Sequence, residues 1–91
     1  MAVRVLIPTP LRKLTADVDS VDLEAGDIRR IIDQLEQRYP GFRARVCDDC
    51  GDLRRFINVY VDGEDVRFLD NLSTKVGDGV EVSIVPAIAG G

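Results

Sequence analysis

Only one stretch of the chain has the hydrophobic spacing of a long helix, and this limits the folds that the chain can adopt. Its apolar residues recur at positions i, i+3, i+4 and i+7, on one face of an amphipathic helix. They are Ile28, Ile31, Ile32 and Leu35. Asp27 can cap this helix through its carboxylate, and Pro40 and Gly41 end it. Because one helix covers only one face of a sheet, we expect the other face to be open.

Five shorter stretches alternate between apolar and polar residues, which is typical of β-strands. They cover residues 2–7, 18–23, 53–61, 66–68 and 80–85. Asp62-Gly63-Glu64-Asp65 predicts a hairpin turn, and Gly77-Asp78-Gly79 predicts a turn before the last strand. Residues 9–16 and 70–76 are expected to be connections, and the irregular segment 42–52 can hold a short helical turn.

The order of these elements is ββαβββ, which predicts the α+β class with a mixed sheet wrapped round one main helix. A length of 91 residues suits one domain. If the first and last strands pair in parallel at the centre of the sheet, the fold is the ubiquitin-like β-grasp. The alternation predicts the strands and leaves their order in the sheet open.

The composition excludes several classes of protein. The chain has no His, so it offers no Ser–His or Cys–His couple and no His metal ligand. Its net charge of −4 disfavours nucleic acid, because phosphate neutralisation supplies most of that affinity. No apolar run approaches the ~20 residues that span a bilayer, and the first residues do not resemble a secretory signal. We expect a small cytoplasmic protein that is not itself an enzyme and binds neither nucleic acid nor membrane.

The last residues suggest a different kind of site. After the last strand the sequence reads Ile88-Ala89-Gly90-Gly91. Glycines permit most backbone conformations, and four extended residues reach about 14 Å, so such a tail can enter a narrow channel. Its tip is the α-carboxylate of Gly91, which becomes an acyl donor once it is coupled to a leaving group such as AMP. We expect residues 1–87 to form one domain and residues 88–91 a flexible tail; the alternative is a frayed end without function.

Several motifs resemble those of a known family. Residues 62–68, with the sequence DGEDVRF, residues 77–82 and residues 85–91 are together similar to the ThiS/MoaD family of ubiquitin-like sulfur carriers. Within that family, Ile7-Pro8-Thr9 and residues 55–61 are most similar to the CysO-type carriers of actinobacterial cysteine biosynthesis. The resemblance covers essentially the whole chain and implies the β-grasp fold.

The resemblance also implies a mechanism. An E1-like enzyme would use ATP and Mg²⁺ to adenylate Gly91, a sulfur source would convert the adenylate to a thiocarboxylate, and a synthase would accept the sulfur. The product would be a small metabolite such as cysteine, a cofactor or a sulfur-containing natural product. The chain would bind no cofactor of its own. An alternative is a ubiquitin-like protein modifier that is joined to lysine through Gly91.

The tail and the open sheet face indicate which residues contact such partners. The expected set is Gly91 as the reacting group, with Gly90, Ala89, Ile88, Phe56, Tyr60, Phe68 and Arg67 in the partner interface. The aromatic residues of this set would form an apolar patch with Arg54, Arg55 and Arg67 at its rim. The alternative is that they pack across strands or under a loop.

Cys47-Asp48-Asp49-Cys50 is a second candidate site. Two thiolates at this spacing supply half of a zinc site, but the chain offers no obvious second half. The neighbouring aspartates would raise the pKa of the thiols, which disfavours a redox pair. We therefore expect free thiols and no metal; an adventitious or intermolecular metal site and a labile disulfide are the alternatives.

Overall fold

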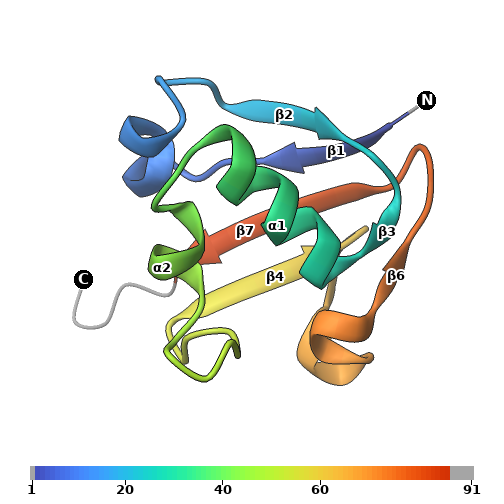
Figure 1. Cartoon of the computed structure of the whole chain (residues 1–91). Helices are drawn as coiled ribbons and strands as arrows, with labels where there is room; N and C mark the ends of the chain where they lie inside the picture. The colour runs from blue at the N-terminus through green and yellow to red at the C-terminus, as the bar shows by residue number, and fades with distance from the viewer. Residues whose placement is uncertain (1, 87–91) are drawn as a thin grey trace.

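The computed structural model describes residues 2–86 (Figure 1). The protein contains a five-stranded mixed sheet. The strands lie in the order β2-β1-β7-β4-β5. Their bounds are β1 Val3–Leu6, β2 Ser20–Leu23, β4 Ile57–Val61, β5 Glu64–Asp65 and β7 Glu81–Pro86. The pair β1–β7 is parallel and central, and the other pairs are antiparallel. This order confirms the predicted β-grasp, with β7 set one residue later than expected and β4 beginning at Ile57 and not at Leu53.

The helix α1, Ile28–Arg38, packs across one face of this sheet (Figure 1). Its predicted apolar stripe is buried throughout, because every member faces the strands. The Asp27 carboxylate accepts a hydrogen bond from the Arg30 backbone N–H at 2.8 Å, which confirms the predicted cap. Within residues 2–86, no helix is both long enough and apolar enough to cross a membrane.

Short elements complete the core. They are β3 Gly26–Asp27, β6 Lys75–Val76, α2 Phe42–Val46 and the 3-10 helices η1 Thr9–Leu14, η2 Val66–Phe68 and η3 Asn71–Ser73. Phe42 and Val46 are fully buried, which confirms a helical turn in the irregular segment. β3 and β6 form a two-stranded antiparallel sheet that the sequence pattern did not predict.

The prediction of a strand over residues 66–68 is wrong. The returning strand β5 contains only Glu64 and Asp65, and the next three residues form η2. The reason is local, because the Asp65 carboxylate accepts a hydrogen bond from the Arg67 backbone N–H at 2.8 Å and turns the chain. In a strand Val66 and Phe68 would share a face, whereas in η2 Val66 is buried and Phe68 is exposed; three residues are too few for the sequence pattern to distinguish the two structures.

Candidate functional site

The predicted tail follows the central strand of the sheet. The ladder between β4 and β7 extends to the pair Ile57 and Pro86. In Figure 1, β7 ends at the edge of the molecule where α2 and the blue turn η1 lie. Pro86 is the last residue that the structure describes, so the predicted site residues Ile88, Ala89, Gly90 and Gly91 lie outside the described residues.

Arg67 ties η2 to the start of β4. Its guanidinium donates three hydrogen bonds, to the Asn58 side-chain oxygen at 2.7 Å, the Ile57 carbonyl at 2.8 Å and the Arg54 carbonyl at 2.9 Å. Asn58 lies opposite Val85 of β7, and Ile57 lies opposite Pro86. Arg67 therefore holds in place the first residues of β4, which pair with the end of β7, and we call its three hydrogen bonds the Arg67 brace. The guanidinium that the sequence placed in a partner interface is thus engaged within the protein.

The face of the sheet opposite α1 carries the predicted aromatic residues of β4. Ile57 and Val59 point into the core, whereas Asn58 and Tyr60 alternate to the other side and are half-buried. Phe56, which immediately precedes β4, is 50% exposed. Exposed Phe56 and half-buried Tyr60 thus share the uncovered face with Val85, which is 41% exposed.

Phe68 is the most exposed large apolar side chain among the described residues, at 87%. It follows Arg67 on η2, next to the brace on Asn58. η2 packs against β4, so the structure places Phe68 near the patch predicted on that strand.

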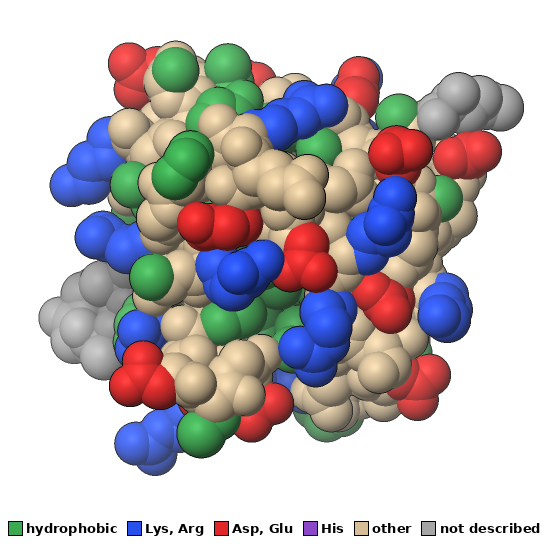
Figure 2. Space-filling model, viewed as in Figure 1, with side chains coloured by type: hydrophobic (Ala, Val, Ile, Leu, Met, Phe, Trp, Pro, Cys, Tyr) green, Lys and Arg blue, Asp and Glu red, His purple; other side chains and the backbone are tan. Residues whose placement is uncertain are grey.

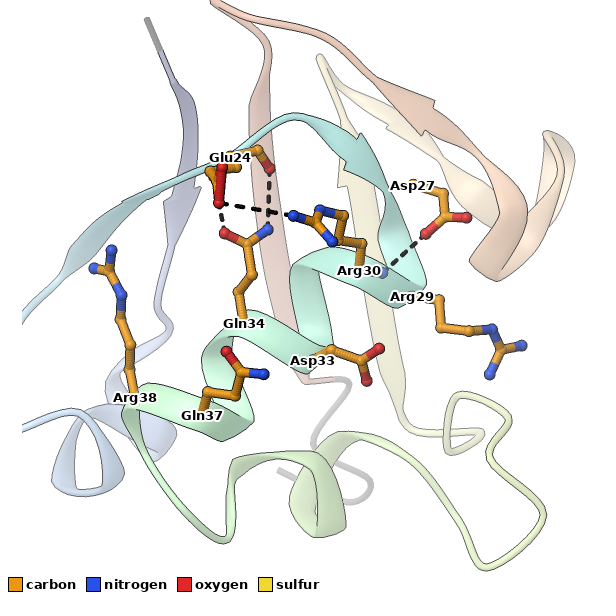
Figure 3. Close-up of a pocket in the computed structure, with 8 residues that line it drawn as sticks. All are labelled: Glu24, Asp27, Arg29, Arg30, Asp33, Gln34, Gln37 and Arg38. Carbon is orange, nitrogen blue, oxygen red and sulfur yellow. Dashed lines mark hydrogen bonds and ion pairs between the residues drawn. The ribbon is translucent and has the colours of Figure 1, made fainter.

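A hollow on the outer face of α1 is a poor candidate for a reactive site (Figure 3). The Gln34 side chain donates to the Glu24 carbonyl at 3.0 Å and accepts from its N–H at 2.9 Å, and Arg30 pairs with the Glu24 carboxylate at 3.7 Å. Figure 2 shows basic and acidic side chains interspersed over this face. These side chains satisfy one another and join α1 to the preceding chain, so we assign them a structural role.

The two cysteines have opposite environments. Cys47 is buried and its pKa is raised by that burial, whereas Cys50 is exposed, and both thiols are free. The Asp48 carboxylate accepts from the backbone N–H groups of Cys50 and Asp52, which holds the connecting loop as a turn. Across residues 2–86, no three His, Cys, Asp or Glu side chains are grouped as metal ligands.

Sequence reasoning missed Asn58 as a part of the site, and it placed the side chain of Arg54, not its backbone carbonyl, at the rim of the aromatic patch. Asn58 carries the acceptor for Arg67, and Arg54 contributes a backbone carbonyl to the same guanidinium. A polar residue within a strand was the only available signal for Asn58. A backbone acceptor leaves no signal in a sequence, since every residue has a carbonyl.

The chain was compared with known proteins. It matches the ThiS family over residues 5–91. It is 44% identical to the sulfur carrier protein CysO of Mycobacterium tuberculosis, with both chains covered completely. A chain in the crystal structure of the Amycolatopsis orientalis BexX/CysO complex has a TM-score of 0.93 and 47% identity, covering 99% of this chain and 100% of that one. Small archaeal modifier protein 3 of Haloferax volcanii is 37% identical over 77% of this chain and 72% of its own.

Proposed function

The chain belongs to the ThiS family, and from this membership we propose that it carries sulfur as a thiocarboxylate on Gly91. The observation that supports this most directly is the 44% identity to a protein named as a sulfur carrier, in an alignment that covers this whole chain, Gly90 and Gly91 included. The chain acts as a co-substrate, and its partners supply the catalytic groups.

The chemistry has two steps before transfer. In the first, an oxygen of the Gly91 carboxylate attacks the α-phosphorus of ATP, which forms the acyl-adenylate and releases pyrophosphate. In the second, a sulfide-level donor attacks the acyl carbon, which forms the C–S bond and expels AMP. After sulfur has passed to its acceptor and the remaining acyl group has been hydrolysed, the carboxylate returns and the carrier is used again.

The fold suits a carrier because it provides a rigid support for a reacting end. β7 is paired with β1 on one side and with β4 on the other, and the Arg67 brace holds the first residues of β4. Placing the reacting group on a chain that follows this strand lets an enzyme position the group by binding the folded domain.

We propose two kinds of partner, an E1-like adenylating enzyme that consumes ATP with Mg²⁺ and a synthase that accepts the sulfur. The open face with Phe56, Tyr60 and Val85, together with Phe68, is the proposed docking surface. An exposed aromatic centre with a polar rim is the usual composition of such surfaces. We place the reaction in the cytoplasm, where ATP is available, and the sulfur acceptor in cysteine biosynthesis or a related pathway to a small sulfur compound.

A second function is favoured by one relative, the small archaeal modifier protein. In that case the activated Gly91 carbonyl would be attacked by a lysine amine, which forms an isopeptide bond and releases the activating group. Both functions use the same adenylation, so only the product distinguishes them. Conjugates of high mass on lysine would favour modification, and a free thiocarboxylate would favour sulfur transfer.

The activation step is tested by measuring ATP–pyrophosphate exchange by the adenylating enzyme with four forms of the chain. We expect exchange with the wild type and with Gly77→Ala, whose added methyl group meets no atom within 4 Å. We expect none with a chain that lacks Gly91 or with Gly90→Trp, and all four forms should melt at the same temperature. Exchange with the shortened chain would disprove the assignment of Gly91.

A further inference from the structure

A group of basic side chains lies at the end of the molecule from which β7 leads to the tail. Arg12 and Lys13 of η1 and Arg45 of α2 line one open hollow together with Thr9 and Asp17. Two elements that are far apart in the sequence thus bring three cations together, and we call Arg12, Lys13 and Arg45 the basic rim. Figure 2 shows Lys and Arg side chains along the left edge of the view, the edge where η1 and α2 lie in Figure 1.

The charge of the basic rim is not neutralised within the described part of the chain. Arg4, Arg30, Arg43 and Lys75 each lie within 4.0 Å of a carboxylate. No described carboxylate comes that close to a member of the basic rim. Lys13 and Arg45 are exposed, and the Nε of Arg12 donates to the Ile7 carbonyl at 3.1 Å, which fixes its position.

The register of the sheet places the basic rim beside the origin of the tail. β1 and β7 run parallel with Leu6 next to Ser83, so both strands point to the same edge. η1 begins three residues after Leu6, and β7 ends three residues after Ser83. A surface that receives residues 87–91 must therefore also approach η1 and α2.

We propose that the basic rim docks against an acidic surface of the adenylating enzyme, next to the channel that admits the tail. The inference rests on the proposed function and adds the chemistry of the partner surface. A protein surface fits better than a phosphate group, because the Asp17 carboxylate lines the same hollow and would repel a small dianion. Carboxylates on a protein can face Lys13 and Arg45 while staying clear of Asp17. The net charge of −4 disfavours nucleic acid as the occupant.

Such a contact acts mainly on association. Opposite charges on two surfaces orient the approaching partners and raise the association rate, and added salt weakens the effect. For this chain the effect is directional, since the three cations of the basic rim share one hollow at the end that must approach the enzyme. The basic rim therefore governs the KM for the carrier and leaves the rate of adenylation in the formed complex unchanged.

The test compares two double variants that change the net charge equally. One is Lys13→Glu with Arg45→Glu, in the basic rim. The control is Arg29→Glu with Arg38→Glu. Both arginines are exposed on the outer face of α1, and neither forms an ion pair with another described residue (Figure 3). Steady-state adenylation is measured with the full chain at about 50 mM and about 300 mM NaCl, where screening differs strongly.

We expect the rim variant to raise the KM for the carrier about tenfold at low salt, with kcat within about twofold and a weaker dependence on salt than the wild type. The control should change KM by less than about twofold. A second double variant, Lys13→Gln with Arg45→Gln, removes the two charges without reversing them and should raise the KM for the carrier by about threefold. It keeps the test valid where the charge-reversed variant fails to fold.

Equal KM values for the rim and control variants would overturn the proposal while leaving the carrier function intact. A raised KM for ATP with an unchanged KM for the carrier would also overturn it, because the basic rim would then contact nucleotide phosphate. Absence of adenylation with the wild type would instead remove the proposed function on which the inference rests.

Discussion

Replacing Arg67 tests whether its guanidinium braces the end of the sheet. Arg67→Met keeps most of the aliphatic stem and removes the donors to Asn58, Ile57 and Arg54. Arg55→Met is the matched control, since Arg55 is exposed and no hydrogen bond from its side chain joins it to the described residues. Both variants lose one positive charge.

The expected loss follows from the three bonds. A hydrogen bond from a charged donor contributes about 1.5–3 kcal/mol, but the acceptors on half-buried Asn58 and Arg54 can recover part of this by binding water. We therefore expect Arg67→Met to lower the free energy of unfolding by about 2–3 kcal/mol. In a domain of this size that lowers the melting temperature by roughly 8–24 °C. Arg55→Met should change the free energy by less than about 0.5 kcal/mol.

Urea unfolding gives the free energies, and amide hydrogen exchange locates the change. The Ile57 N–H donates to the Arg54 carbonyl at 2.9 Å, within the braced segment, so its exchange should accelerate more than that of the α1 amides. If the two variants differ by less than about 0.5 kcal/mol, the brace does not stabilise the fold and this reasoning is refuted.

Three further predictions concern the helices and the exposed aromatic residues. The Glu36 pKa is lowered from its ordinary value of 4.5 because its carboxylate accepts hydrogen bonds from the backbone N–H groups of Arg43 and Gly41. Glu36→Gln should therefore melt at a lower temperature than the wild type at neutral pH, and the difference between their melting temperatures should disappear as the pH falls below 4.5. A difference that stays constant with pH would contradict this. Phe42→Ala empties a fully buried site and should cost about 3–5 kcal/mol in urea unfolding, whereas a loss under about 1 kcal/mol would contradict its place in the core. Phe68→Ser should leave the melting temperature unchanged and raise the KM for adenylation or sulfur transfer, and an unchanged KM in both reactions would exclude it from the docking surface.

The sequence predicted the parts of the fold that repeat a period over many residues. The stripe from Ile28 to Leu35 and the alternation of β1, β4 and β7 reflect burial on one face, which every residue of the element shares. The β3–β6 pair escaped prediction because two residues show no period and their partners are joined only by the tertiary structure. At η2, the side-chain turn of Asp65 determined the conformation.

The candidate site divides in the same way. Gly90 and Gly91 could be proposed as site residues from the sequence, because the argument for them depends only on residue type and not on which residues lie nearby in the fold. The exposure of Phe56 followed from the expectation of one helix and one open face. The basic rim could not be predicted, because Lys13 and Arg45 meet only after η1 and α2 are placed at the same edge.

The central claim is that the working group of this protein is the carboxylate of Gly91. It is tested most directly by intact and fragment mass spectrometry after incubation with the adenylating enzyme, ATP, Mg²⁺ and sulfide. The account predicts a mass gain equal to the replacement of one oxygen by one sulfur, located by fragmentation on Gly91. An unmodified Gly91, or sulfur found only on Cys47 or Cys50, would contradict it.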